Sequence, residues 1–109
     1  METHKLKIYR HGDLLIKSLE TLPSNLKAIS GYTLAYGKIS NHHHTLVKER
    51  ENIIELMEDK NGNKFFHIPQ TTKLSHQEHK TIEIEKGFYE VIIEKERDPF
   101  LGNIRNVVD

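Results

Sequence analysis

The chain has no cysteine and no tryptophan, and only three of its 109 residues are proline. Without cysteine it can form neither a disulfide bond nor a thiolate metal site. The sequence has no run of eighteen apolar residues, so no segment is predicted to cross a membrane as a helix. Residues 1–5 also lack the apolar core of a signal peptide. We therefore expect a cytoplasmic protein with no membrane partner.

Net charge is also missing from the chain. Sixteen Lys and Arg residues balance sixteen Asp and Glu residues. A balanced chain has no overall electrostatic field that would attract nucleic acid or an anionic membrane surface. A chain of 109 residues has the size of one domain, and we expect a single domain over residues 1–109.

Helical periodicity is absent over any convincing length. The best helical candidate, residues 18–26, is interrupted by Pro23. Short apolar or alternating runs bounded by turn residues are typical of strands. They occur at residues 6–9, 14–17, 31–37, 45–47, 81–85 and 88–96. We therefore predict an all-β, mainly antiparallel fold, either a small β-barrel or a sandwich, with at most short helical turns.

The clearest local signal is a β-hairpin. Residues 52–57 and 64–68 are apolar runs that flank Asn61-Gly62. An Asn-Gly pair favours a type I′ turn, in which both central residues have positive φ angles. Pro69 then ends the second arm of the hairpin.

Histidine, in contrast, is abundant: the chain has eight, and five of them lie in two short stretches. His42, His43 and His44 are consecutive, and His76 and His79 follow later in the chain. Histidine is the commonest metal ligand, and it changes charge near neutral pH. If the fold brings the two stretches together, they form either a metal site or a pair of proton-transfer groups.

The spacing of the histidines predicts which of them converge. Strand alternation places His42 and His44 on one face and His43 on the other. His76 and His79 are three residues apart, so they converge on a tight polar turn. We predict a divalent metal site with His42, His44, His76 and His79 as ligands. Nitrogen and oxygen ligands suit Zn(II), Fe(II), Mn(II), Ni(II) or Cu(II).

Glu49 and Glu78 are the carboxylates closest in sequence to the two stretches. If the metal keeps an open coordination position, it can activate water or polarise a substrate oxygen. We predict catalytic roles for His44, His79 and Glu78 in such a site. A metal-dependent hydrolase is one outcome, and isomerases and dioxygenases use the same kind of centre.

Two other classes of function remain open. His44 and His79 could cleave RNA without a metal, one taking the proton of the 2′-OH group and the other protonating the leaving oxygen. Lys38, Lys73 or Arg97 would then hold the phosphate. The chain could instead be a non-enzymatic module, whose open sheet edges pair with a second copy to form a homodimer or with another partner.

One metal motif is similar to that of a known family. Gly37, four residues, His42-x-His44, four residues and Glu49 resemble the first motif of the cupins, with one residue fewer after the glycine. The resemblance implies a small β-barrel that holds a metal through these residues and a later histidine. The Pro-x-Gly of the second cupin motif is not found.

A second resemblance spans the chain. The pattern is similar to that of a group of small, functionally uncharacterised proteins from bacteria, archaea and their viruses. It implies no activity, but it singles out the four predicted ligands and makes His43 incidental. Asn41 replaces a glycine of the group's pattern, and His11 stands where the group has a glutamine. The matching segments are residues 12–15, 41–44, 76–79, 87–91 and 104–109.

The remaining histidines are expected to be surface or turn residues. These are His4, His11 and His67. His11 is the one that could approach the site, because it precedes Gly12-Asp13. Asp13 is interpreted first as a turn cap and second as a carboxylate that orients an imidazole ring.

Overall fold

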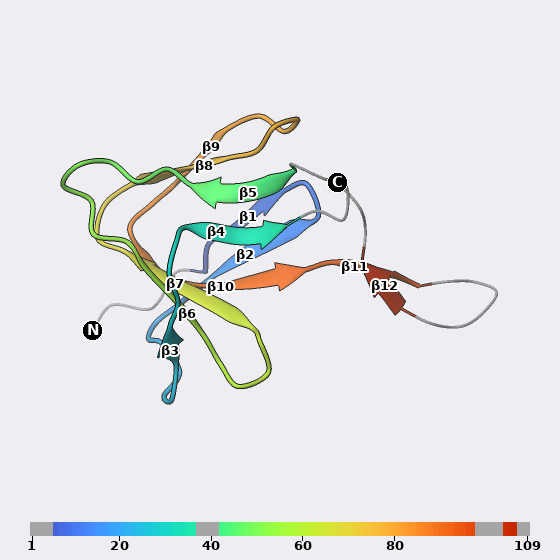
Figure 1. The fold of residues 1–109 in the computed structure, drawn as a ribbon, viewed down its shortest axis with the longest axis horizontal. Coiled ribbons are helices and arrows are strands. Elements are labelled where there is room, and N and C mark those ends of the chain that lie inside the picture. The colour runs from blue at the N-terminus through green and yellow to red at the C-terminus, as the bar shows by residue number, and fades with distance from the viewer. Residues whose placement is uncertain (1–5, 37–41, 98–103, 107–109) are drawn as a thin grey trace.

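The computed structural model describes residues 6–36, 42–97 and 104–106, with the backbone alone for residues 95–97 and 104–106 (Figure 1). Every regular element in this part of the chain is a strand, and no helix there is long and apolar enough to cross a membrane. The prediction of an all-β, antiparallel fold is confirmed. The strands are β1 (Ile8–His11), β2 (Leu14–Leu19), β3 (Lys27–Ala28), β4 (Thr33–Tyr36), β5 (His43–Leu46), β6 (Glu55–Glu58), β7 (Lys64–Ile68), β8 (Thr72–Ser75), β9 (Ile82–Ile84), β10 (Gly87–Ile93), β11 (Lys95–Arg97) and β12 (Ile104–Asn106).

The strands form two main sheets. One has six strands in the order β1-β2-β10-β7-β6-β3, and the other has four in the order β4-β5-β8-β9. β11 and β12 pair with each other as a separate two-stranded ribbon. Neither main sheet closes on itself within the described residues, because β1 and β3, and likewise β4 and β9, are unpaired edges. Of the two predicted alternatives, the barrel, and the cupin-like barrel with it, is therefore wrong, and the described strands form two open sheets as in a sandwich.

A single apolar core joins the two sheets. Side chains alternate along each strand, so that Leu14, Ile16 and Ser18 of β2 are buried while the residues between them are half-buried. The six-stranded sheet also contributes Leu56, Phe66, Ile68 and Tyr89, and the four-stranded sheet contributes Leu34, Ala35, Leu46, Leu74 and Ile84. The buried face of each sheet thus rests on that of the other.

The β1–β2 hairpin turns through only two residues, Gly12 and Asp13. The register pairs His11 with Leu14, and Gly12 has a φ of 62°. A glycine at the first central position is the requirement of a type II′ turn, which matches the twist of the two strands. The tight turn places the side chains of His11 and Asp13 at the same end of the six-stranded sheet.

The turn of the β6–β7 hairpin differs from the predicted type I′ turn. Within residues 59–63 only Gly62 has a positive φ, at 84°. The Gly62 N–H donates to the Asp59 carbonyl at 3.1 Å, and the Asp59 N–H donates to the Asn63 carbonyl at 3.0 Å. The Asp59 carboxylate accepts the N–H groups of Asn61 and Asn63. These bonds hold a three-residue loop with glycine in the left-handed position.

Tyr89 is the largest fully buried side chain of the core. Its ring stacks on Phe66 with centroids 5.2 Å apart, and its hydroxyl donates to the Glu85 carbonyl at 2.7 Å. Burial is the main cause that raises the pKa of the Tyr89 phenol above its ordinary value of 10.0, and the neighbouring Tyr9 adds to the shift. The phenolate is therefore disfavoured in the folded state.

We predict that Tyr89→Phe lowers the free energy of unfolding by about 1 kcal/mol at neutral pH, because one buried hydrogen bond is lost. Above pH 10 the unfolded chain ionises at Tyr89 while the folded chain does not. The stability of the natural protein should therefore fall with rising pH, by up to about 1.4 kcal/mol per pH unit from this group. Urea unfolding at pH 7 to 11 measures both effects. Tyr36→Phe is the matched control, since Tyr36 is 73% exposed. A pH slope that persists unchanged in Tyr89→Phe would contradict the prediction.

Candidate functional site

Histidine rings from both sheets meet at one end of the core. His44 lies in β5, and His76 and His79 lie in the turn that joins β8 to β9. The ring centroids are 4.4 Å apart for His44 and His76, and 5.8 Å apart for His44 and His79. His42 contacts the same group through His76, at 5.7 Å. The structure therefore brings together the two histidine stretches that are separate in the sequence.

His11 is a central residue of the cluster, although the sequence predicted it only as a residue that could approach the site. It was expected to be a surface or turn residue, but it is only 3% exposed. Its Nδ1 lies 2.8 Å from Nδ1 of His44, which is 2% exposed. The expectation of a surface or turn position for His11 is thus wrong, whereas His11 does approach the other histidines. Strand alternation from Tyr9, which packs on the core, turns His11 inward as well.

The outer nitrogens of this pair are held by oxygen atoms. His11 Nε2 lies 2.9 Å from the Lys80 carbonyl oxygen, and His44 Nε2 lies 3.2 Å from Oδ1 of Asp13. A carbonyl oxygen or a carboxylate can only accept, so in each ring Nε2 carries the hydrogen. The neutral form of each ring then presents a lone pair at Nδ1. Asp13 therefore orients an imidazole, which was the second of its two interpretations.

Two lone pairs that face each other at 2.8 Å repel. The arrangement of His11 and His44 is satisfied only when something positive lies between the two Nδ1 atoms. A shared proton meets this requirement, because one ring then becomes a cation whose charge Asp13 balances. A metal ion meets it equally well, because neutral imidazole nitrogens are metal ligands.

His42 repeats the same pattern at the margin of the cluster. Its Nε2 lies 3.2 Å from Oε1 of Glu78, and its Nδ1 is buried with no hydrogen-bond partner among the described residues. The Glu78 side chain is 59% exposed, whereas that of His42 is 19% exposed. Glu78 is therefore the carboxylate at the solvent side of the cluster.

His76 has a different hydrogen-bonding pattern. Its Nδ1 accepts the backbone N–H groups of Glu78 at 3.0 Å and of His79 at 3.3 Å. These bonds close the turn after β8, which is the tight polar turn that the sequence predicts. They also place the ring hydrogen of neutral His76 on Nε2. His79, which the turn holds 5.7 Å from His11 and 5.8 Å from His44 by ring centroids, is thus better placed than His76 to offer a lone pair.

Other residues of the sequence-based site lie outside the cluster. The His43 ring contacts Tyr36, and its backbone N–H donates to Gln77. Glu49 is exposed beyond the end of β5, so the third position of the cupin-like motif does not meet the histidines. His67 pairs with Glu55 at 3.0 Å. Gly37, Lys38, Asn41 and His4 fall outside the described residues, as does the side chain of Arg97.

No group of three or more His, Asp or Glu side chains that could hold a metal ion is found among the described residues. What the described residues do show at the centre of the cluster is the buried pair of His11 and His44. Three further imidazoles lie around this pair. Of the two carboxylates, Asp13 pairs with His44 and Glu78 pairs with His42.

The matched family covers most of the chain. Residues 10–94 match a family described as Domain of unknown function (DUF8820), and the chain belongs to this family. The matched segment includes His11, Asp13 and the whole histidine cluster. Neither the curated proteins nor the solved structures contain a significant match to the chain.

The hydrogen-bond pattern predicts the position of each ring hydrogen in metal-free protein. Long-range proton–nitrogen NMR spectra should show hydrogen on Nε2 of His11, His42 and His44, and a strongly deshielded proton shared by the two facing Nδ1 atoms. His67, which pairs with Glu55 through Nδ1, serves as the internal reference for the opposite tautomer. Spectra in which His11 and His44 titrate as independent, solvated rings would contradict the geometry.

Proposed function

We propose that this protein binds one divalent transition-metal ion through the Nδ1 atoms of His11 and His44. The observation that carries the proposal is their 2.8 Å separation, with each Nε2 held by an oxygen atom. A metal-ligating histidine almost always donates its other ring N–H to a carboxylate or a backbone carbonyl. Asp13 and the Lys80 carbonyl supply one of each kind.

The spacing of the two nitrogens supports a shared ion. Two nitrogens bound to one metal at about 2.0–2.1 Å lie about 2.9 Å apart in octahedral geometry and about 3.3 Å apart in tetrahedral geometry. The observed 2.8 Å needs only a small widening to reach either arrangement. When the ion replaces the shared proton, the two Nε2 atoms can keep their hydrogen bonds to the Lys80 carbonyl and to Asp13.

His79 is the third ligand that we propose. Three imidazoles on one tetrahedral metal have ring centroids about 5 Å apart. The three centroid separations among His11, His44 and His79 are 4.9, 5.7 and 5.8 Å. The ring of His79 therefore needs an inward shift of less than about 1 Å, together with a rotation, to complete the set. His42 and His76, which the sequence also predicts as ligands, would flank the ion.

The donor set determines which metals fit. Imidazole ligands suit Zn(II), Fe(II), Ni(II) and Cu(II), whereas Mn(II) prefers a site richer in oxygen. Zn(II) accepts three nitrogens and leaves a fourth position for water. We therefore propose Zn(II) first, with Fe(II) and Ni(II) as the next candidates.

Hydrolysis is the reaction that such a centre would support. The exposed carboxylate of Glu78, held by His42, is placed to accept a proton at the solvent side of the cluster. In this proposal His44 and His79 act as ligands and Glu78 acts as the base.

The geometry favours the metal over the metal-independent ribonuclease. An acid–base pair must reach the two sides of an exposed phosphate, but His44 is 2% exposed and its ring lies nearly parallel to that of His79, at 12°. Lys73, one of the predicted phosphate-binding residues, is exposed on β8 beside Glu83 of the neighbouring strand. The metal site is therefore the function that the arrangement of these residues supports better.

Protein purified without a nickel column and treated with a chelator should bind one Zn(II) or Co(II) per chain. Calorimetry gives the stoichiometry, and the visible spectrum of Co(II) reports nitrogen ligands. His11→Ala and His44→Ala should each lower the affinity at least a hundredfold, and His79→Ala at least tenfold, because each removes a ligand.

His43→Ala is the matched control, since His43 belongs to the same triplet but contacts Tyr36 instead. It should bind within twofold of the natural protein. Thermal melting verifies that each variant folds, and His44→Gln replaces His44→Ala if the latter does not. Equal metal affinity in the natural protein and in a folded His11 variant would refute the proposal.

The two carboxylates should separate binding from catalysis. Asp13→Asn removes the charge that orients His44, so the metal affinity should fall about 10- to 100-fold. Glu78→Gln should leave the affinity within threefold but abolish any metal-dependent hydrolysis of p-nitrophenyl esters or phosphodiesters. If the metal-loaded natural protein shows no turnover above that of the free ion, the site is structural and the non-enzymatic interpretation applies.

A further inference from the structure

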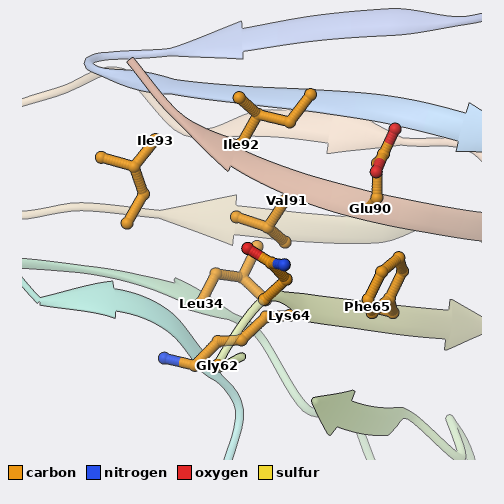
Figure 2. Close-up of a pocket in the computed structure, with 9 residues that line it drawn as sticks. Leu34, Gly62, Lys64, Phe65, Glu90, Val91, Ile92 and Ile93 are labelled. Atoms are coloured by element: carbon orange, nitrogen blue, oxygen red, sulfur yellow. The ribbon is translucent and has the colours of Figure 1, made fainter. Parts of the chain in front are cut away.

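A second candidate site lies in a cavity of about 440 Å³ at the edge of the core (Figure 2). It is found where β7 begins and β10 ends, and Leu34 of the four-stranded sheet also lines it. Among the described residues, no histidine lines this cavity. The cavity is therefore separate from the proposed metal site.

The walls of the cavity are aliphatic where Leu34, Val91 and Ile93 line it, and polar where Asn63 and Lys64 line it. Val91 and Ile93 occupy the face of β10 that also carries the buried Tyr89, and Leu34 approaches from β4. Figure 2 shows Glu90 and Ile92 on the other side of β10 from these three residues, so the Glu90 carboxylate points away from them. The space between the sheets can thus accept an apolar chain.

One cation, Lys64, lines the same cavity. The residue is half-buried, and its ammonium group lies 6.0 Å from the centroid of the Tyr36 ring. No carboxylate in the described part of the chain forms an ion pair with it, although Glu58 is its cross-strand neighbour. A partly buried ammonium group is stabilised by an anion, because a charge out of water needs a partner.

We propose that this cavity binds a small aliphatic carboxylate. The chain would lie between Leu34, Val91 and Ile93, and the carboxylate would pair with Lys64. The volume is within the range of small-molecule sites and is large enough for a medium-length aliphatic chain. The aliphatic walls provide affinity, and the single cation selects the charge of the head group.

Octanoate, 1-octanol and octylammonium test the proposal, because they share the chain and differ in the head group. Titration of the full-length protein, followed by proton–nitrogen NMR and calorimetry, should give saturable octanoate binding with the largest shifts at Leu34, Val91 and Ile93. Octanol should bind at least tenfold more weakly, and octylammonium should not saturate. Equal binding of octanol and octanoate, or no saturation by octanoate, would overturn the proposal.

Variants of the cation and of the walls sharpen the test. Lys64→Met should weaken octanoate binding at least tenfold without changing octanol binding, and Lys64→Arg should stay within threefold. Lys73→Met removes an exposed lysine of β8 and should have no effect. Val91→Phe fills the cavity and should abolish binding of both compounds, and Ile93→Phe takes its place if Val91→Phe does not fold. Octanoate binding that is unchanged in a folded Lys64→Met protein would overturn the proposal, whatever the metal measurements show.

Discussion

The contact between Nδ1 of His11 and Nδ1 of His44 is the interaction on which the interpretation of this protein depends. It joins the first strand of the six-stranded sheet to β5 of the other sheet, at a depth where both rings are almost fully buried. Oxygen atoms hold the two outer nitrogens, so the inner ones face each other as acceptors. Two acceptor nitrogens in contact in a protein interior are unfavourable unless a proton or a metal ion lies between them. The contact therefore constrains the chemistry of the site as well as the packing of the two sheets.

Much of the fold could be predicted from the sequence, because the strands are short, amphipathic and separated by turn residues. The apolar run predicted at residues 14–17 and the break at Gly12-Asp13 correspond to the start of β2, which extends to Leu19, and to its turn. The choice between barrel and sandwich could not be predicted, since it depends on whether distant edge strands pair, and local patterns carry no signal for that. The prediction of a type I′ turn at Asn61-Gly62 was wrong for a local reason. The Asp59 side chain accepts the backbone N–H groups of Asn61 and Asn63 and so stabilises a longer loop.

The site was predictable in part for the same reason. The spacing of His42, His44, His76 and His79 indicated a convergence, and the structure brings these residues together. His11 could be identified only as a histidine that could approach the site, because its partner lies 33 residues away and a histidine beside a glycine resembles a turn residue. The position of Tyr9 was the signal that could have placed His11 in the core. In a strand, residues two positions apart lie on the same face, and Tyr9 faces the core. The carbonyl of Lys80 could not be found from the sequence, since every residue has one.

The histidines of the cluster come from β1, from β5 and the residue before it, and from the β8–β9 turn, and they therefore join the two sheets. An ion held between them would act as a cross-link in a chain that has no disulfide to play this part. Such a cross-link can form only after both sheets are assembled, so acquisition of the ion would be a late event in the life of the folded chain. Its release would require the two sheets to separate locally at this end. The exchange rate of the ion would then report how often the sheets open. The lifetime of the metal-bound protein would depend on the barrier to this opening as well as on the binding equilibrium of the ion.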